Sequence, residues 1–466
     1  MKFGLSGRGR LNKMKDRVIG RIILRGLLEN TSPFLIGNGE GDQIDIRIIK
    51  NSEGKAYIPA TSFAGAVRHH MEKFISKDNK IFEYVFGSEN NGVYQSHLVV
   101  DDLISDNAVI SFRDGVAIDN EKNIVKTDEK EHGMKYDYEI VEPGAEFKVN
   151  LETTIREGAD KEGTIRLLRT IVAELEKENI QIGGKTTSGF GKLKLHDARI
   201  IEFDFTNRDH VSAWLNNDFG SIQTVDLSTI EPFSREETDL IIEATFSLNS
   251  SLIVGLSTGD PGAPDKVNMK SGGKNVIPGT SIKGAIRHRA EKIINTLSND
   301  PECCEAIING LFGYVDEKSK SRMKGRVIVD ECYPKNVEEL VQNRIKIDRF
   351  TSGTITNALF NSAPLWESKG NSRLEVRSVV NDFNDHEAGL MLFVLKDLWN
   401  GDLAIGGEKA VGRGCVRGIR AVIHAGSEKF ELIQEGTGIK ITGNAGKLEE
   451  YALALTEKCT GDDNNA

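Results

Sequence analysis

Residues 58–69 read IPATSFAGAVRH, and residues 277–288 read IPGTSIKGAIRH. The two stretches are identical at eight of twelve positions and lie 219 residues apart. This spacing is far longer than the period of a solenoid repeat, so it indicates a duplicated domain. We therefore expect the chain to contain two copies of one structural plan.

Each stretch has the pattern of a helix start. The proline disfavours strand pairing, and the Thr-Ser pair offers hydroxyl caps to the first free amides. Apolar residues such as Phe63, Val67 and Met71 then recur at helical spacing. Gly65 and Gly284 lie in this early part of the two helices, where glycine costs about 1 kcal/mol relative to alanine. They indicate a close approach, either by protein backbone in a tight packing contact or by a phosphate.

The free N–H groups and partial positive charge at a helix start suit a phosphate group. An arginine at the same place in both copies favours anion binding over a merely capped helix. The candidate contacts in the two stretches are Ser62, Arg68, Ser281, Lys283 and Arg287.

A second motif is also repeated. Residues 183–191 read GGKTTSGFG and residues 406–414 read GGEKAVGRG, each after an amphipathic helix predicted at 165–175 or 390–399. Neither is a phosphate-binding P-loop, because neither shows the pattern G-x-x-x-x-G-K-[ST] followed by a helix. Such a loop either holds RNA backbone or forms a strained turn before a strand. The candidate RNA contacts are Gly183, Gly184, Lys185, Gly406, Gly407 and Lys409.

A glycine-rich loop and a short hairpin precede each helix start. Aligning Lys50 with Lys270 pairs Asp45 with Asp265, five residues earlier in each copy. A loop carboxylate beside a basic helix start can hold a divalent cation or orient a ribose 2′-hydroxyl. The competing interpretation is that each aspartate only forms a local turn.

Long polar segments interrupt both copies, at 113–119 and at 344–353. Such segments inside a compact domain are usually functional or disordered. The second one combines cations with an aromatic residue, a composition that suits single-stranded RNA, although a solvated hairpin would look similar. The candidate RNA contacts in it are Arg344, Lys346, Arg349 and Phe350.

The composition is that of a soluble protein with two or three domains. The 466 residues carry a net charge of −10, which excludes a generic nucleic-acid coat but permits a narrow basic groove. No apolar run approaches the roughly 20 residues of a membrane span, so we expect no membrane partner. Five scattered cysteines without a C-x-x-C pair favour the reducing cytoplasm.

Taken together, this order of motifs resembles the RAMP superfamily of CRISPR systems, most closely the backbone subunit of type III effector complexes. The run IDRFT at 347–351 is similar to the start of that family's thumb hairpin. The resemblance implies an α+β fold with two tandem ferredoxin-like (RRM-like) β-α-β-β-α-β domains and inserted thumbs, as in fused type III-D-like subunits. The expected boundaries are an N-terminal arm at 1–16, domains at 17–205 and 238–425, a linker at 206–237, and a C-terminal extension at 426–466 with a disordered end.

The resemblance also implies a function. The chain would bind guide crRNA, complementary target RNA and other effector subunits, and would act as an endoribonuclease. Asp45 and Asp265 would be its catalytic and metal-binding residues, with Mg²⁺ or Mn²⁺ as the cofactor and the 2′-hydroxyl as a candidate nucleophile. Ala60 and Ala64 replace Gly279 and Lys283 in the first copy, which weakens a phosphate contact there. The alternatives are a non-catalytic RNA-binding scaffold and a guide-processing endonuclease that uses His69, His70 or His288.

Overall fold

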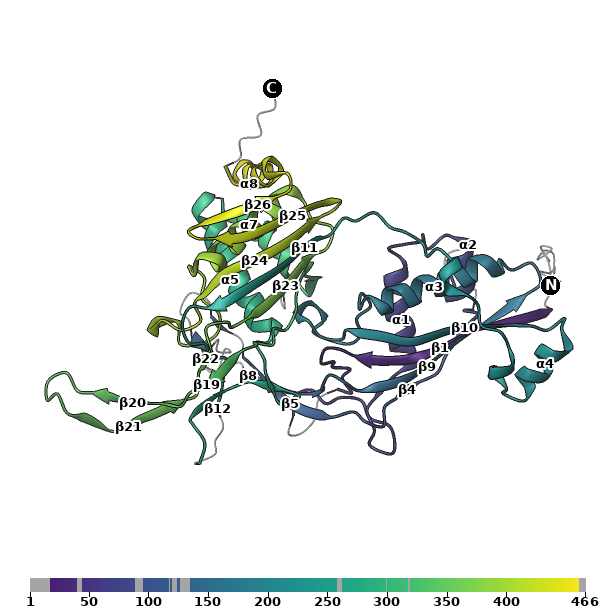
Figure 1. Ribbon diagram of the computed structural model, residues 1–466, viewed down its shortest axis with the longest axis horizontal. Coiled ribbons are helices and arrows are strands. Elements are labelled where there is room, and N and C mark those ends of the chain that lie inside the picture. Colours follow the sequence, from purple (N-terminus) through teal and green to yellow (C-terminus); the bar gives the residue numbers. More distant parts are fainter. Residues whose placement is uncertain are drawn as a thin grey trace, which may run out of the picture. The chain divides into compact units, whose positions relative to one another are not determined.

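The structure is a computed structural model that describes residues 17–39, 44–88, 95–116, 118–119, 124–125, 135–257, 262–298, 300–316 and 319–460. The chain divides into two compact units (Figure 1). Unit 1 comprises Met1–Ser111, Glu139–Gly184 and Gly191–Arg235, and unit 2 comprises Phe112–Tyr138, Lys185–Phe190 and Glu236–Ala466. Two segments of the first sequence repeat therefore belong to unit 2.

The main sheet of unit 1 is antiparallel and has the strand order β10-β1-β9-β3. Its strands are β1 (Val18–Asn30), β3 (Leu98–Val100), β9 (Glu146–Arg156) and β10 (Leu193–Asp204). Helices α1 (Ala60–Met71) and α3 (Lys161–Glu176) cover one face (Figure 1), and α2 (Lys80–Phe86) follows α1. The apolar positions that predicted the first helix, Phe63, Val67 and Met71, are buried.

The opposite face of this sheet is covered by the first part of the segment that we expected to be a linker, whereas its later part lies beside α3, where Arg169 donates to the carbonyl oxygen of Leu227 at 3.2 Å. The segment forms α4 (Arg208–Leu215) and the 3₁₀ turns η2 (Phe219–Ser221) and η3 (Leu227–Thr229). Ala213 of α4 packs in a cluster with Ile23 and Phe203, and Phe219 meets the Phe203 ring edge-on at 5.5 Å. The first part of residues 206–237 is therefore folded onto unit 1, which ends at Arg235.

The main sheet of unit 2 repeats this arrangement and extends it. Its order is β18-β23-β11-β24-β25-β26, again antiparallel throughout. The strands that correspond to those of unit 1 are β11 (Leu240–Leu248), β18 (Val327–Val329), β23 (Leu374–Val380) and β24 (Val416–Ala425). The corresponding helices are α5 (Gly279–Leu297), α6 (Pro301–Phe312) and α7 (Asp385–Asn400). The mixed α+β class predicted from the sequence is confirmed.

The C-terminal extension belongs to unit 2. Strands β25 (Glu428–Glu435) and β26 (Gly438–Thr442) lengthen the sheet beyond β24, and α8 (Ala445–Thr460) packs on α7 (Figure 1). Gly389 permits this packing, because a Cβ there would overlap the carbonyl oxygen of Tyr451. The predicted arm at 1–16 and the predicted disordered end at 461–466 lie outside the described residues.

A long hairpin of β20 (Gln342–Ile347) and β21 (Thr354–Ser362) projects from unit 2 (Figure 1). Its base joins β12 (Gly255–Ser257) and β13 (Lys266–Asn268) in a small sheet. In the first repeat the corresponding ladder pairs β5 (Ile110–Val116) with β8 (Lys135–Val141). The remaining short elements are β2 (Tyr57–Ile58), β4 (Leu103–Ile104), β6 (Ile118–Asp119), β7 (Ile124–Val125), β14 (Lys270–Ser271), β15 (Lys274–Asn275), β16 (Gly313–Asp316), β17 (Ser321–Lys324), β19 (Val337–Glu339), β22 (Leu365–Glu367), η1 (Thr186–Ser188) and η4 (Lys409–Val411).

Candidate functional site

The two repeated helix starts form as predicted, but their caps differ from the prediction. Pro59 and Pro278 occupy the N-cap positions of α1 and α5, and neither helix has a side-chain cap hydrogen bond. The predicted hydroxyl cap is therefore wrong. Ser62 and Ser281 lie instead at the third helical position, inside the first turn, because the helix begins directly after the proline.

Gly65 and Gly284 are exposed on the surfaces of these helices. A Cβ added to either glycine would meet no atom within 4 Å in the structure. Packing within the described part of the chain thus does not account for a residue that costs about 1 kcal/mol in a helix. The open backbone is accessible to a ligand.

A cluster of cations lies beside Gly284. Burial, followed by the nearby charges of Arg287 and Lys324, lowers the pKa of Lys283 to about 8. Arg287 donates to Glu291 Oε1 at 3.0 Å, whereas Lys283 has no ion pair or side-chain hydrogen bond within the described ranges. A partly desolvated ammonium without a counterion is electrostatically unfavourable, and a bound anion would relieve that cost.

The corresponding place in the first repeat is less basic. Ala64 stands where the second repeat has Lys283. Arg68 donates to the carbonyl oxygen of Phe86 at 3.3 Å and lies over the Phe82 ring, so it ties α1 to α2. The amide of Ala60 donates to Asp102 Oδ1 at 2.7 Å. A carboxylate of the chain itself thus occupies the position at which an anion would meet this helix start.

Three further basic residues lie near α5 that the sequence analysis did not single out as RNA contacts. Lys324 comes from β17, and its charge acts on Lys283. His288 and Lys292 are four residues apart on α5. Both lie close enough to Lys409 of η4 for their charges to interact with its charge. Burial and then Lys292 lower the pKa values of Lys409 and His288. The i,i+4 spacing of His288 and Lys292 was visible in the sequence, but their proximity to Lys409 depends on the fold.

The glycines at the start of both repeated loops are explained by the fold. Gly183 and Gly406 have φ values of 75° and 86°. The next amides, of Gly184 and Gly407, donate to the carbonyls of Leu35 at 2.7 Å and Ile253 at 2.8 Å. A Cβ at Gly406 would lie 2.6 Å from the same Ile253 oxygen. Of the two predicted roles, the turn before a strand accounts for these glycines.

Within unit 2 the first loop has an aromatic environment. Lys185 donates to the Tyr136 hydroxyl at 2.9 Å and lies 4.3 Å from the centre of the Tyr138 ring. The guanidinium of Arg113 lies over Phe190, and it forms a buried ion pair with Glu331. These contacts satisfy Lys185 within the protein.

Asp45 and Asp265 occupy equivalent places. Asp45 lies three residues before Ile48, the bridge partner of Gly37, and Asp265 lies three residues before Asn268, the partner of Gly255. Both aspartates are exposed. Asp265 is tied to the long hairpin, because the Asn361 amide donates to its Oδ2 at 2.9 Å and its own amide donates to Asn361 Oδ1 at 2.6 Å.

A family model described as the RAMP superfamily matches residues 27–194 and, separately, residues 245–417. Together the two matches cover more than half of the chain. The chain belongs to the RAMP superfamily. The predicted tandem arrangement is confirmed, since each match spans most of one repeat. A search of curated proteins finds no match.

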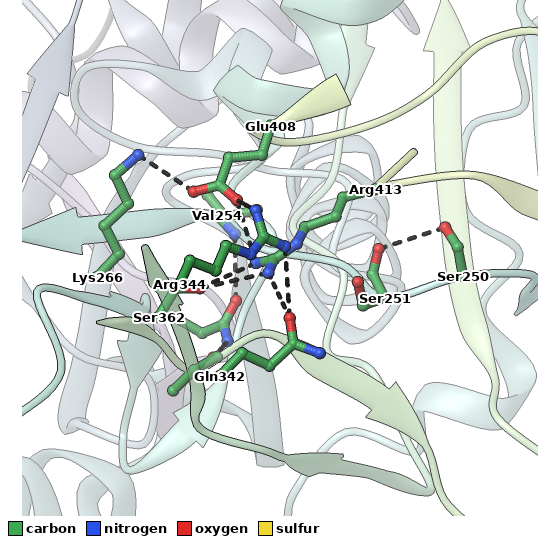
Figure 2. Close-up of polar contacts among 11 residues, drawn as sticks. Ser250, Ser251, Val254, Lys266, Gln342, Arg344, Ser362, Glu408 and Arg413 are labelled. Carbon is green, nitrogen blue, oxygen red and sulfur yellow. Dashed lines mark hydrogen bonds and ion pairs between the residues drawn. The ribbon is translucent and has the colours of Figure 1, made fainter. Parts of the chain in front are cut away.

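The second RAMP repeat carries a polar cluster at the base of its hairpin (Figure 2). Arg413, which is 1% exposed, donates to Gln342 at 2.7 Å and to Ser362 at 3.3 Å. Arg344 donates to Glu408 at 3.2 Å, and Glu408 also pairs with Lys266. Arg344, a candidate RNA contact, is therefore engaged within the chain, and Arg413 was not predicted.

The tip of the same hairpin is open to solvent. Asp348 Oδ1 accepts hydrogen bonds from the amides of Phe350 at 2.9 Å and Thr351 at 2.8 Å, which also lowers its pKa. Phe350 is 98% exposed, and Lys346 and Arg349 are exposed as well. The turn thus presents a ring and two cations without internal packing.

The histidines of the guide-processing alternative have ordinary surroundings. His70 lies 2.8 Å from Glu174, and the second repeat places Arg289 at 2.6 Å from Asp397 in the equivalent contact between helices. His69 is largely exposed beside Glu72. The His70 contact is therefore a structural tie that both RAMP repeats contain.

The described residues contain no group of three or more His, Cys, Asp or Glu side chains arranged to hold a metal ion. They also contain no helix that is long and apolar enough to cross a membrane. Asp45 and Asp265 therefore each offer one carboxylate. Such a donor fits Mg²⁺ or Mn²⁺ held mainly by substrate phosphates and water.

Proposed function

We propose that this chain is a backbone subunit of a type III CRISPR effector complex, and that it binds guide crRNA for pairing with complementary target RNA. Membership of the RAMP superfamily supports this proposal. The observation that carries the RNA-binding role is the start of α5. There Lys283 is partly buried without a counterion in the described part of the chain, beside the open backbone of Gly284.

The phosphate backbone is the natural ligand for this cluster. Lys283, Arg287 and Lys324 add charge to a helix N-terminus, which already favours anions. Contacts of this kind bind any sequence, as a subunit that holds guides of different sequence must do. Phe350, exposed at the hairpin tip, would stack on or separate bases.

The fold proposal is that both units are ferredoxin-like. In each unit the first strand lies between the third and the fourth, and the second strand lies at an edge beside the third. With a helical connection after the first and third strands, this is the order expected of a β-α-β-β-α-β domain. Two such domains in one chain would supply two adjacent backbone positions, as in type III-D-like fusions.

The proposal extends to metal-dependent cleavage of target RNA at Asp45 and Asp265. Its support is their equivalent placement, exposed, directly before the returning strand of each loop. Each carboxylate would contribute one ligand to Mg²⁺ or Mn²⁺, which would stabilise negative charge at the scissile phosphate. The chain's own part is to position that carboxylate beside the bound RNA.

A second candidate is a scaffold that binds RNA without cleaving it. The specific observation in its favour is the reciprocal pair of hydrogen bonds between Asp265 and Asn361. These bonds fasten the loop to β21 and give Asp265 a structural role.

RNA binding is tested with Lys283→Ala and single-stranded guide RNA over a range of salt concentrations. Loss of one phosphate contact should reduce the slope of log K against log salt by about 0.7. Lys440→Ala is the matched control, because Lys440 is an exposed β26 lysine that pairs with Glu435. An unchanged slope in Lys283→Ala would remove the basis for the proposed contact.

Cleavage is tested in the assembled complex with guide RNA and end-labelled complementary RNA, with Mg²⁺ and with a chelator. Asp45→Ala and Asp265→Ala should each slow one defined cut by about 100-fold or more, and the double variant should lose both. Cuts that persist in the double variant, with target binding intact, would favour the scaffold. A single 2′-deoxy nucleotide at the cut separates attack by the neighbouring 2′-hydroxyl from attack by water.

A further inference from the structure

Arg413 joins the glycine loop of the second repeat to the base of the hairpin (Figure 2). Its side chain is 2% exposed. The guanidinium donates to Gln342 Oε1 at 2.7 Å and to Ser362 Oγ at 3.3 Å. Gln342 and Ser362 are cross-strand partners, and Ser362 also pairs with Lys266 of β13. Arg413 therefore bonds to a rung of the sheet at which β13, β21 and β20 lie side by side.

Asp265 lies next to this rung. It precedes Lys266, and its partner Asn361 precedes Ser362. The Asn361 amide donates to Asp265 Oδ2 at 2.9 Å, and the Asp265 amide donates to Asn361 Oδ1 at 2.6 Å. The Oδ1 atom of Asp265 makes no hydrogen bond within the described part of the chain. The reciprocal bonds therefore fix one oxygen of the carboxylate and leave the other open to a cation.

Glu408 supplies a second link between the glycine loop and the loop that carries Asp265. Its Oε1 accepts a hydrogen bond from Lys266 at 3.2 Å. Its Oε2 accepts one from Arg344 at 3.2 Å and lies 3.4 Å from Arg413. The residue directly after Asp265 is thus tied to a carboxylate that also pairs with Arg413.

Packing alone does not explain an arginine at position 413. A buried guanidinium is unfavourable unless its hydrogen bonds are satisfied, and the Nε atom of Arg413 has no partner among the residues that the structure describes. At the equivalent position of the first repeat, Phe190 is 1% exposed. An apolar side chain can therefore fill the same place in this fold.

The first repeat anchors its aspartate loop differently. Glu139 of β8, which is 5% exposed, accepts hydrogen bonds from the Ile48 amide at 3.0 Å and from Lys50 at 3.2 Å, and so holds the segment after Asp45. Ala363 is the equivalent residue of the second repeat, because the amides of both residues donate to the residue after the aspartate. Ala363 has no carboxylate, so the second repeat needs a different anchor.

We propose that Arg413 is a positioning residue for Asp265. By holding Ser362, it keeps the neighbouring Asn361 amide on the Asp265 carboxylate. Through Glu408, it also restrains the loop on the other side of Asp265. Because Arg413 is buried, it acts through these neighbours and not by touching RNA. Its effect on cleavage rests on the proposed function, whereas its effect on the Asp265 loop does not.

Hydrogen exchange on the millisecond timescale tests the positioning in the full chain without RNA. Arg413→Met removes the guanidinium and keeps an unbranched side chain. The amides of Asp265 and Asn361, each bonded to the other's side chain, should then exchange about 10-fold faster. The equivalent amides of the first repeat should be unchanged. Arg420→Met is the matched control, because Arg420 is an exposed arginine of β24 in the same unit.

Single-turnover cleavage in the assembled complex tests the consequence for the reaction. Arg413→Met should slow the cut that Asp265→Ala slows, by about 10- to 100-fold, because the carboxylate is no longer held in place. The cut assigned to Asp45 and the affinity for target RNA should not change. Combining Arg413→Met with Asp265→Ala should be no slower than Asp265→Ala alone, since both changes act at one carboxylate.

Unchanged exchange at Asp265 and Asn361 in a folded Arg413→Met variant would overturn the proposal. Equal slowing of both cuts, or weaker target binding, would show a general structural role and would overturn it too. If Arg413→Met does not fold, Ser362→Ala, which removes the acceptor on β21 and keeps the pair with Glu408, must give the faster exchange. If Asp265→Ala slows no cut, the proposed cleavage fails, and the exchange measurement still decides the positioning.

Discussion

The loops at 183–191 and 406–414 have similar backbone conformations and different surroundings. Their outer glycines are explained by contacts that both repeats share, such as Gly184 to Leu35 and Gly407 to Ile253. Their central residues differ, because Ser188 is covered within unit 2 and Val411 is exposed. The comparison shows that one motif can be a folding element at its ends and a docking element in its middle.

The largest difference in stability between the two loops should appear when the arginine beside each loop is replaced by alanine. Arg113→Ala would leave Glu331 buried without its ion pair, at a cost of about 3–5 kcal/mol in the free energy of unfolding. Arg344→Ala should cost less than about 1 kcal/mol, because Arg344 is partly exposed and Glu408 keeps other partners. Denaturant titration followed by the fluorescence of Trp366 and Trp399, both in unit 2, measures the difference. Equal costs for the two variants would contradict a docked first loop.

Alanine substitutions at Gly189 and Gly412 separate the energetic cost of lost packing space from the cost of backbone strain. Gly189→Ala and Gly412→Ala should both pay about 1–2 kcal/mol for a left-handed alanine. Only Gly189→Ala should pay a further 1–3 kcal/mol, roughly, for overlap with the backbone at Asp330 and Glu331. The same denaturation measurement gives both values. A Gly412→Ala variant as unstable as Gly189→Ala would show that the second loop is also covered.

Lys283 and Ala64 give a pH-dependent comparison of the two helix starts. Because burial lowers the pKa of Lys283 to about 8, the unfolded chain holds its proton to higher pH, and stability should rise as pH increases through 8. Lys283→Met should be more stable than the native chain at pH 7 and should lose this rise. RNA affinity of the native chain should fall several-fold between pH 7 and 9 as the charge is lost. Ala64→Met in the first repeat, the matched control, should change neither pH dependence.

The smallest effect should come from the exposed helix glycines. Gly65→Ala and Gly284→Ala should each stabilise the RNA-free chain by up to about 1 kcal/mol, because nothing in the structure opposes a Cβ there. If RNA backbone approaches the second helix closely, Gly284→Ala should weaken RNA binding despite the gain in stability. Anisotropy titrations beside thermal melts measure both quantities. Higher stability with unchanged affinity would separate this glycine from RNA binding.

Much of the architecture followed from the repeated motifs. They predicted two domains, the positions of α1 and α5, and the helices before the glycine loops, and the family resemblance implied the α+β class. Aligning Lys50 with Lys270 in the sequence paired Asp45 with Asp265. In the structure, the strand bridges put both aspartates at equivalent positions. Local patterns are reliable here because each copy repeats the same periodicity and the same turn residues.

Other features depended on contacts between distant residues. The Thr-Ser pair has the composition of a cap, yet the proline takes that position, and Asp102 bonds to the first amide of α1. Arg344 has the composition of an RNA contact, yet Glu408 engages it. Lys324 and Arg413 gave no local signal, because their importance comes from Lys283 and from Gln342, residues 41 and 71 positions away.

The sequence by itself determined the duplication, the two helix starts and the glycine turns, since each depends on residues within about one turn or one loop. Only the tertiary structure decided which cations lack a counterion and which copy of the glycine loop is covered. Desolvation and burial depend on everything that surrounds a side chain, and most of those neighbours are distant in sequence. Lys283 and Val411 are therefore the residues that the fold, and not the motif, singles out.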